Sequence, residues 1–422
     1  MEFQAVILAA GQGSRISDLT SSMPKALLPV ANMPMIWYPV QMLEKAGFQE
    51  AIVVVLEETR ADIEKALVEI CDVKIKLEFV TIPDSIDWGT ADSLRHIRDK
   101  IKTDVMLVSC DVITDVSLHL LADLHRTYDA TVTMLLSPAI DITDVSVPGG
   151  KANRKMERDI VGLDSTGNRL LFLSSEADIE EEVIPVKRRF LKRHPLMNLH
   201  TRLMDGHLYL MKRRVLDLLA EESSISTIKG ELMPYLVRKQ FSRKDNSSGE
   251  MSKKESGGSD EEDYTKLALK MSVWNGNDDR DSDSDSDVRC HAYVMDGGLC
   301  LRTNTLVTYC EANRQAGQLI DHKQVHSTAN VHQKSQVGSD SLVGDGSTVS
   351  ERVSVKHSVI GRHCNIGEKC RITNCVIMDY VTIKEGCTLS GCIVCDNVSI
   401  DEKCELKDCL VGRSQCIQPM SE

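Results

Sequence analysis

The stretch Leu8–Val30 brings together residue types that could hold the phosphates of a nucleotide. It begins inside an apolar run from Phe3 to Ala9, which is typical of a buried parallel strand. Gly11 and Gly13 follow that run at once. Because glycine lets the backbone turn sharply and brings N–H groups close to a ligand, this turn can form an anion-binding nest.

Two cationic side chains follow the glycine turn. Arg15 lies two residues after Gly13, where its guanidinium could clamp a phosphate with two hydrogen bonds. Lys25 comes directly after Pro24, and its ammonium group is a mobile point charge for a phosphate. The turn lacks the Gly-Lys-Ser/Thr ending of a P-loop and the third glycine of a dinucleotide-binding turn. A plain strand-to-helix turn is the alternative interpretation of the glycines alone.

The complete stretch resembles the signature of sugar-phosphate nucleotidyltransferases, which runs roughly L-A-G/A-G-x-G-T-R-L-x-x-L-T-x-x-x-P-K-x-L-x-P-V. In that family the matching arginine and lysine hold the triphosphate at the reacting phosphorus. The resemblance therefore implies this role for Arg15 and Lys25, beside the turn formed by Gly11 and Gly13.

Two later blocks extend the resemblance. Gly89–Ser93 is similar to the Gly-Thr-Ala block near the base, and it places Thr90 in that position. Asp111 follows the apolar strand Val105–Val108 and is similar to the aspartate that binds the catalytic magnesium. Cys110 stands where glycine is usual in the family.

Length and composition exclude several classes of protein. At 422 residues the chain is too long for one ordinary core, so at least two domains are expected. The net charge of −13 argues against a nucleic acid as a direct partner. No signal peptide is recognised, and no apolar run approaches the roughly 18 residues of a membrane span. We therefore expect a cytosolic protein with no membrane partner, whose fourteen cysteines are free thiols.

Residues 1–241 alternate apolar strands with helical patterns. Strands are expected at Ala5–Ala9, Ala51–Leu56, Leu77–Ile82, Val105–Ser109, Ala130–Leu136 and Leu208–Met211. Helices are expected at Ile36–Ala46, Thr59–Val68, Thr90–Lys100 and Leu118–Thr127. This alternation predicts a Rossmann-like α/β domain with a mostly parallel sheet. Ligands of such sheets bind beyond the carboxyl ends of the strands, which suits one site shared by the Gly11 turn and Asp111.

Residues 242–288 break the pattern with a run rich in Ser, Asp, Asn, Gly and Lys. They hold thirteen acidic and seven basic residues, so nearly half of the excess negative charge of the chain lies here. Such a segment cannot bury enough apolar surface to offset its ordering entropy, and we predict a disordered acidic insert. It would act as a solvated tether or, alternatively, as a phosphorylatable tract that tunes a partner contact.

Residues 289–322 are expected to complete the first domain and to lead into a repeat that spans 323–418. Valines stand six residues apart from Val325 to Val355. The spacing then becomes five, six and six through Ile417, so that it recurs every seventeen residues. A period of six predicts a parallel β-helix with three short faces per turn, and repeats of this type resemble the left-handed form. The open last coil predicts burial against a partner or a shortened variant of a longer chain.

The repeat also explains most of the cysteines, because nine of the fourteen lie between residues 364 and 416. Seven of these nine fall where such coils place small inward residues, and free cysteine there behaves as a small hydrophobe; they are Cys364, Cys370, Cys375, Cys387, Cys392, Cys404 and Cys409. Cys392 and Cys395 form a C-x-x-C pair, but no second pair lies at zinc spacing, so no metal site is predicted.

The late block of the nucleotidyltransferases is altered in this chain. That block resembles W-x-D-I-G-T-P followed by Y-L-E-A-N, whereas Leu301–Leu306 and Tyr309–Asn313 place Arg302 at the second metal aspartate. An arginine in place of an aspartate changes the local charge by two units. The interaction of each unit charge with a metal ion's charge at 4 Å is worth roughly 4 kcal/mol at an effective dielectric of about 20. The exchange predicts loss of magnesium and of catalysis. No Glu-Lys-Pro sugar block is found, and His200 and His207 are expected to be packing or surface residues.

A second resemblance covers nearly the whole chain apart from the insert and the short C-terminus. The chain is similar to the gamma subunits of translation initiation factor 2B, the guanine-nucleotide exchange factor that recharges initiation factor 2. That family combines a degenerate transferase domain, an acidic insert and a hexapeptide β-helix. The match rests on Met1–Phe3, Ile36–Pro39, Thr103–Val105, Ile113–Val116 and Pro234–Gln240.

The resemblance implies a non-catalytic subunit without cofactors. It would support a homologous epsilon subunit, which performs the exchange, together with the other subunits, and help to bind initiation factor 2. The alternative is an active sugar-1-phosphate nucleotidyltransferase, such as a GDP-mannose pyrophosphorylase. A third possibility is a nucleotide sensor. The retained nucleotide-binding set would be Gly11, Gly13, Arg15, Lys25, Thr90 and Asp111.

Overall fold

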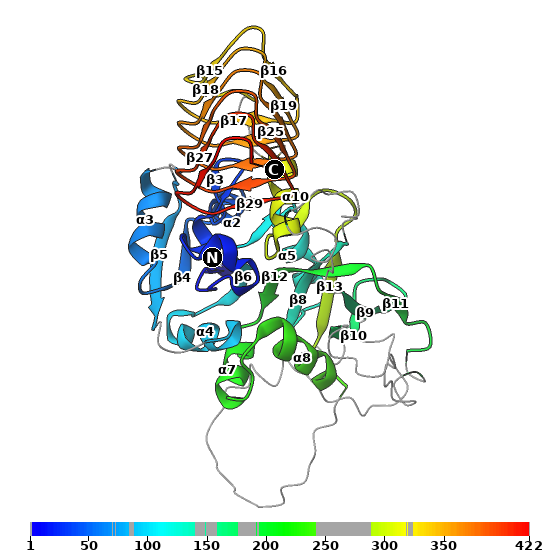
Figure 1. The fold of residues 1–422 in the computed structure, drawn as a ribbon. Coiled ribbons are helices and arrows are strands. Elements are labelled where there is room, and N and C mark those ends of the chain that lie inside the picture. Colours follow the sequence, from blue (N-terminus) through cyan, green and yellow to red (C-terminus); the bar gives the residue numbers. More distant parts are fainter. Residues whose placement is uncertain are drawn as a thin grey trace, which may run out of the picture.

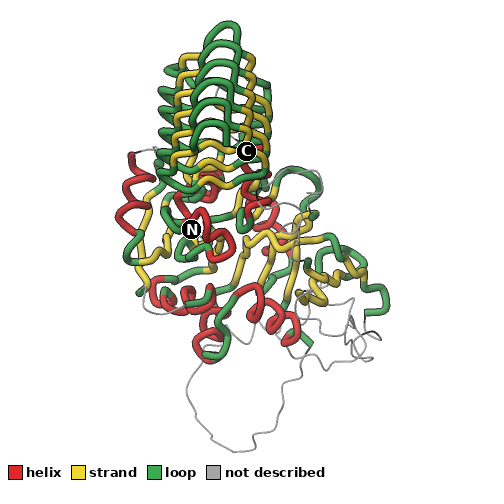
Figure 2. Tube along the Cα trace, in the orientation of Figure 1, coloured by secondary structure: helices red, strands yellow, loops and turns green. Residues whose placement is uncertain are grey.

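The structure is a computed structural model, and it describes residues 2–69, 71, 73–83, 88–139, 148, 158–175, 191, 194–241, 288–317, 319 and 324–421. The expected insert lies outside the described residues except for Val288. An α/β domain and a column of short strands make up the described chain (Figure 1). Figure 2 shows that the column is built of strands and turns, while the helices surround the sheet of the α/β domain.

A seven-stranded sheet forms the centre of the α/β domain, in the order β13-β8-β12-β6-β1-β4-β5. The six expected strands are confirmed, and four of the six pairings are parallel. β12 is antiparallel to both neighbours, because a small second sheet reverses the chain before it. The strands are β1 Phe3–Leu8, β4 Glu50–Leu56, β5 Lys76–Ile82, β6 Asp104–Ser109, β8 Val132–Pro138, β12 Leu203–Met211 and β13 Cys290–Val294.

Helices cover both faces of this sheet. One face packs against α2 (Trp37–Lys45), α3 (Arg60–Glu69), α5 (Leu118–Thr127) and α10 (Leu306–Ala316). The other face packs against α4 (Thr90–His96), α7 (Arg214–Glu221) and α8 (Met233–Lys239). The expected helix Thr90–Lys100 ends at His96 and continues as the 3₁₀ turn η3 (Arg98–Lys100). Both faces are therefore apolar, which is why the strand sequences are nearly continuous hydrophobic runs.

Two smaller sheets complete the domain. β9 (Asp159–Leu163) pairs antiparallel with β10 (Leu170–Ser175) and β11 (Asn198–His200). These three strands were not predicted from the sequence; each is short, between three and six residues long. β7 (Val112–Thr114) pairs antiparallel with β14 (Cys300–Arg302), and this pair lies at the carboxyl end of β6.

The repeat forms a parallel β-helix with three strand faces, as predicted. The first face contains β15 Asn330–Val331, β18 Thr348–Val349, β21 Asn365–Ile366, β24 Thr382–Ile383, β27 Ser399–Ile400 and β30 Cys416–Ile417. The second contains β16 Gln336–Val337, β19 Ser354–Lys356, β22 Arg371–Thr373, β25 Thr388–Ser390 and β28 Glu405–Lys407. The third contains β17 Leu342–Val343, β20 Val359–Ile360, β23 Val376–Ile377, β26 Ile393–Val394 and β29 Leu410–Val411.

Small polar side chains join successive coils inside the β-helix. The thiols of Cys364, Cys370 and Cys387 donate to carbonyl oxygens of the next coil at 3.0, 3.0 and 2.9 Å. Ser347 occupies the matching place in an earlier coil, and its hydroxyl donates to the Gly361 carbonyl at 2.7 Å. The cysteines are thus small inward residues, as expected, and they also satisfy backbone acceptors that face the interior.

Native thiol labelling should distinguish these cysteines. All fourteen are free, and Cys416 alone is exposed, while Cys310 and Cys409 are half-buried. Burial raises the pKa of Cys364 to about 12, so that its reactive thiolate is scarce at neutral pH. We expect an aromatic disulfide reagent to modify one thiol per chain rapidly, and Cys416→Ser to remove that phase. Several thiols reacting at one rate would contradict this.

The third face of the β-helix packs against the α/β domain. The outward residue of each strand on the other two faces is mostly polar, whereas on the third face it is always apolar. These outward residues are Leu342, Val359, Val376, Ile393 and Leu410. Val376 and Ile393 are buried in the same core as α10 and α2. This apolar face was not predicted, because the six-residue period concerns only the inward positions, although the outward apolar residues are present in the sequence.

A hairpin at the joint connects the glycine-rich stretch to the β-helix. β2 (Pro29–Val30) and β3 (Met33–Pro34) flank Ala31 and Asn32, whose φ angles are 48° and 66°. The Ala31 N–H donates to Asn313 Oδ1 of α10 at 2.9 Å, which holds this left-handed turn in place. Asn32 donates to the Ile360 carbonyl at 2.9 Å and accepts from Arg362 at 3.2 Å. The hairpin therefore touches both α10 and a coil of the β-helix.

Candidate functional site

Asp111 is the centre of a buried ion cluster at the end of β6. The strand is continued by Cys110, whose N–H donates to the Leu8 carbonyl at 2.9 Å. The chain then turns into β7, and the Asp111 carbonyl accepts from the Thr303 N–H at 2.9 Å. These contacts hold Asp111 at a carboxyl end of the sheet, where ligands of α/β domains bind. Asp111 itself is only 1 % exposed.

Arg302 reaches Asp111 from the neighbouring strand. The β7–β14 ladder pairs Arg302 with Val112, one residue after Asp111. Its Nε donates to Asp111 Oδ2 at 3.1 Å, and its side chain is 25 % exposed. The sequence therefore placed Arg302 correctly beside the aspartate that resembles a magnesium ligand.

Lys25 contacts the same carboxylate oxygen. It begins the 3₁₀ turn η2 (Lys25–Leu27), directly after Pro24, and its Nζ donates to Asp111 Oδ2. Its side chain is 10 % exposed. One carboxylate thus pairs with two cations, so the ion cluster carries a net positive charge. Lys25 and Asp111 are therefore in direct contact, as expected for two residues of one shared site.

The two cations decide the protonation state of Asp111. Burial of the carboxyl opposes ionisation and alone would raise its pKa. The charges of Arg302 and Lys25 act in the opposite direction and outweigh burial, so the pKa of Asp111 lies well below its usual range. Asp111 is therefore an anion at neutral pH, with Oδ1 buried and without a hydrogen-bond partner among the described residues.

The lowered pKa predicts how stability depends on pH. Because the unfolded chain takes up the Asp111 proton at a higher pH than the folded chain, this group stabilises the fold above about pH 4. Its contribution is lost as the pH falls from there toward the lowered pKa, at up to about 1.4 kcal/mol per pH unit. Urea unfolding from pH 6 to pH 3 should show a steeper loss than in Asp111→Asn. Equal slopes would contradict the prediction.

The glycine turn lies beside this ion cluster. Gly13 has a φ of 73°, and a Cβ built on it would lie 3.3 Å from Lys25 Cβ. Among the described residues other than its two chain neighbours, no atom would lie within 4 Å of a Cβ on Gly11, so the space beside that glycine is open. Arg15 lies in η1 (Ser14–Ile16) and is exposed. Gly11 and Gly13 thus lie in one turn, with Gly13 close to Lys25, as expected. Arg15 lies in the 3₁₀ turn that comes directly after Gly13.

Thr90 bonds to a neighbouring turn and not to the ion cluster. Its hydroxyl accepts from the Ile228 N–H at 2.9 Å, at the start of the π-turn η6 (Ile228–Leu232). A Cβ on Gly89 would lie 2.2 Å from the Ser226 carbonyl oxygen, so the backbone of Ser226 covers Gly89. Within the described residues, Thr90 makes no hydrogen bond with Lys25 or Asp111. The Gly-Thr-Ala block here joins α4 to η6.

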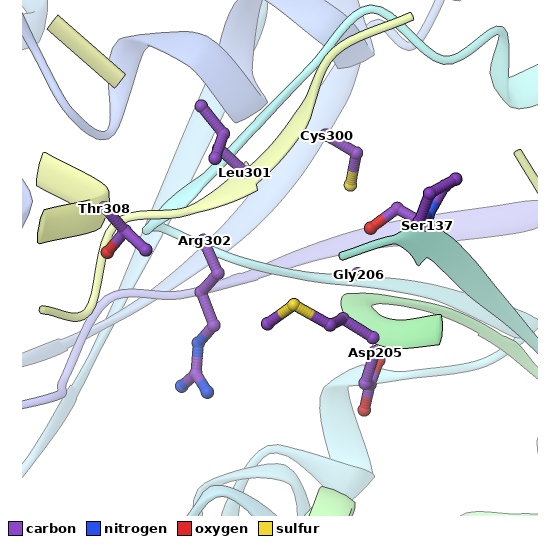
Figure 3. Close-up of a pocket in the computed structure, with 9 residues that line it drawn as sticks. Ser137, Asp205, Gly206, Cys300, Leu301, Arg302 and Thr308 are labelled. Carbon is purple, nitrogen blue, oxygen red and sulfur yellow. The ribbon is translucent and has the colours of Figure 1, made fainter. Parts of the chain in front are cut away.

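Further polar side chains line the same region. Figure 3 shows a small pocket beside Arg302, between β14, the end of β8 and β12, with Asp205 and Ser137 on its wall. Tyr209 donates to Asp205, and burial raises the pKa of Asp205. Burial, reinforced by Arg302, holds the pKa of His207 well below its usual range. His207 is therefore a neutral, largely buried side chain, which agrees with its expected packing role.

The residues of this cluster do not fit the magnesium ion of a nucleotidyltransferase. Magnesium requires several oxygen ligands, and such sites use carboxylates. Asp111 Oδ2 is already paired with Lys25 and Arg302, and Arg302 replaces the second carboxylate. Across the described ranges, no group of three or more His, Cys, Asp or Glu side chains could hold a metal ion. The geometry offers cationic hydrogen-bond donors instead of metal ligands.

Two family models match separate parts of the chain. Residues 4–144 match the model described as nucleotidyl transferase, and residues 322–422 match the model described as the EIF2B subunit epsilon LbH domain. The first match covers the first part of the α/β domain and the second covers the β-helix, and together they confirm the predicted fold class. No described helix combines the length and apolar character needed to cross a membrane.

Three relatives place these matches in context. A translation initiation factor eIF2B subunit gamma of Schizosaccharomyces pombe is 30 % identical over 330 residues, covering 77 % of this chain and 68 % of the relative. The subunit gamma of Dictyostelium discoideum is 29 % identical over 333 residues, covering 74 % of each chain. A mannose-1-phosphate guanylyltransferase of Mycobacterium tuberculosis is 29 % identical over 136 residues, covering 32 % of this chain and 37 % of the enzyme. The chain therefore belongs to the family of translation initiation factor eIF2B gamma subunits.

Proposed function

We propose that this chain is a regulatory subunit of an eIF2B complex that promotes GDP/GTP exchange on translation initiation factor 2. In this proposal it supports a homologous epsilon subunit, with the other subunits of the complex, and helps to bind initiation factor 2 in the cytosol. Family membership supports the assembly. The proposed role requires no direct contact between this chain and a nucleic acid, which agrees with the net charge of −13.

The ion pair between Arg302 and Asp111 is the observation that carries the non-catalytic part of the proposal. A transferase site must stabilise the charge that develops on the phosphates, and a bound metal does so as a Lewis acid. In this chain the guanidinium lies 3.1 Å from the carboxylate that resembles the metal ligand. We infer that the α/β domain works without a metal and without a cofactor.

Purification tests the assembly. Tagged full-length chain, expressed in cells that contain the other subunits, should be recovered from cytosol in a hetero-oligomer with an epsilon-type subunit. The mass of the native complex gives the stoichiometry, and exchange on initiation factor 2 gives the activity of the same sample. A stable solitary monomer from such cells would contradict the proposal.

A transferase assay tests the non-catalytic part. Pyrophosphate release from GTP or UTP with mannose 1-phosphate and magnesium should stay at the level of a blank. Asp111→Ala, assayed in parallel, should give the same value as the parent chain. Turnover by the parent that Asp111→Ala abolishes would show that the chain is an active nucleotidyltransferase.

We also propose that six residues are a nucleotide-binding set inherited from a transferase: Gly11, Gly13, Arg15, Lys25, Thr90 and Asp111. The contact between Lys25 and Asp111 and the position of Gly13 beside Lys25 support this for the phosphate side. Thr90 has weaker support, because its hydroxyl is bonded to η6.

The division of the chain remains part of the proposal. Residues 1–241 form the α/β domain, 242–288 an insert, 289–322 a segment that completes that domain, and 323–418 the β-helix. The pairing of β13 with β8 supports the third assignment, because it returns the chain to the central sheet. Separate expression of 323–418 would test whether the β-helix folds without its neighbour.

A further inference from the structure

We propose that the small sheet β10-β9-β11 binds an extended acidic segment of a partner protein, which adds as a further strand to the free edge of β11. This surface is separate from the ion cluster around Asp111 and from the joint with the β-helix. Figure 1 shows the small sheet at the side of the α/β domain, away from the β-helix. The inference does not depend on which complex the chain joins.

Strand β11 has an open side. In the described chain the order of this sheet is β10-β9-β11, so that β9 is the one strand paired with β11. An edge strand presents unpaired N–H and C=O groups on its other side, and another extended chain can pair with them. Pro195, which has no N–H to donate, precedes the open stretch. The Arg202 carbonyl ends it, because it accepts from the Ala139 N–H at 2.7 Å. An added strand would therefore pair with residues 196–200.

The outer face of the small sheet is apolar. In the register of the sheet, Gly162 of β9 lies between Phe172 of β10 and Leu199 of β11. A Cβ built on Gly162 would lie 2.8 Å from Phe172 Cβ and 3.4 Å from Leu199 Cδ2. Met197 Sδ would lie 3.0 Å from the same point. These three side chains therefore converge over the glycine and form one apolar surface beside the open edge.

Large apolar side chains are exposed at this edge. Leu196 is 71 % exposed and Leu199 is 49 % exposed. Together with Leu191 they make three of the seven large apolar side chains that are exposed in the described chain. Single exposed apolar residues need no explanation, whereas a group of them marks an interaction surface. Residues 196–200 also lack the lysine or glutamate that commonly protects an edge strand from pairing.

The charges beside the edge favour an acidic partner. Arg158 and Arg202 are both exposed. The register of β11 against β9 continues to place Arg202 opposite Asp159, so both arginines lie at one end of the small sheet. Asp159 is buried and pairs with Lys229 at 3.0 Å. A second copy of this chain would bring residues 194–202, which contain no Asp or Glu. A partner with carboxylates at the end of its strand would pair with the arginines.

Fluorescence anisotropy with the full-length chain tests the proposal. The probe is the labelled peptide Glu-Glu-Val-Thr-Val-Thr-Val, and the comparison peptide has lysine in place of both glutamates. We expect the acidic probe to bind at least about tenfold more tightly than the basic one, and added salt to reduce this difference. Amide hydrogen exchange in residues 196–200 should slow when the acidic probe is bound. No binding of the acidic probe, equal binding of both peptides, or unchanged exchange would overturn the proposal.

Variants assign the binding to this edge. Leu199→Ser should weaken binding of the acidic probe about tenfold, because it removes apolar contact area. Leu120→Ser changes a leucine of α5 that is 48 % exposed, and it is the matched control. Arg202→Gln should weaken binding of the acidic probe and leave binding of the basic probe unchanged. Equal affinities in Leu199→Ser and Leu120→Ser would overturn the assignment. A homodimer of the parent chain that Leu199→Ser dissociates would show that a second copy occupies the edge, and would also overturn it.

Discussion

Asp111→Ala should lower the free energy of unfolding by about 3–5 kcal/mol, the range found when one partner of a buried ion cluster is removed. The variant leaves Lys25 and Arg302 close together without their shared anion. Lys25 is only 10 % exposed, so solvent screens the two remaining cations poorly. Urea unfolding at pH 7, followed by circular dichroism, measures the change.

Two controls separate charge from packing in this experiment. Asp345→Ala removes a carboxylate that is 46 % exposed on the β-helix, and it should leave the free energy of unfolding close to that of the parent. The triple variant Asp111→Leu, Lys25→Met, Arg302→Met removes all three charges together and should approach the stability of the parent. A loss below 1 kcal/mol for Asp111→Ala would show that the ion cluster does not stabilise the fold.

Ile393→Ala is expected to have an effect of similar size at the joint between the two parts. Its side chain points outward from the third face of the β-helix and is fully buried in the core shared with the α/β domain. Truncation of a buried isoleucine removes apolar contacts and leaves a cavity, at a cost of about 2–5 kcal/mol. Thermal unfolding measures the loss, and proteolysis reports whether the β-helix separates first.

The matched control is an outward residue on another face of the same column. Thr348 holds the equivalent position on the first face, and it is exposed. Thr348→Ala should change stability by less than about 0.5 kcal/mol. If Ile393→Ala and Thr348→Ala had equal effects, the third face would not be a packing surface, and the joint would have to lie elsewhere.

Sequence reasoning predicted the central strands and the β-helix because both carry strong periodic signals. The buried strands are long apolar runs, and the β-helix places an aliphatic residue at every inward position. The antiparallel direction of β12 could not be predicted, since side-chain alternation is the same in parallel and antiparallel strands. The short strands β9 to β11 were missed because their apolar character is too local to distinguish from loops.

The site was predictable in part for a similar reason. The motif order placed the Gly11 turn and Asp111 at the carboxyl ends of strands, and the sheet brings those ends together. Lys25 and Arg302 then reach Asp111 from the segments beside them. The covering of Gly89 by Ser226 was not predictable, because these residues are far apart in sequence and the contact depends on how α7 leads into η6. The apolar third face was visible in the sequence but could be interpreted only once the coils had been stacked.

The attachment of the β-helix by its side has a consequence for how such chains can change in length. Each coil adds one more rung parallel to the joint, and the hydrogen bonds of Asn32 to the described β-helix go to Ile360 and Arg362. A coil gained or lost at either end of the column would therefore leave the hairpin contacts unchanged. The number of coils in the β-helix can therefore change without altering the hairpin contacts at the joint. Related chains could then carry β-helices of different lengths on the same α/β domain.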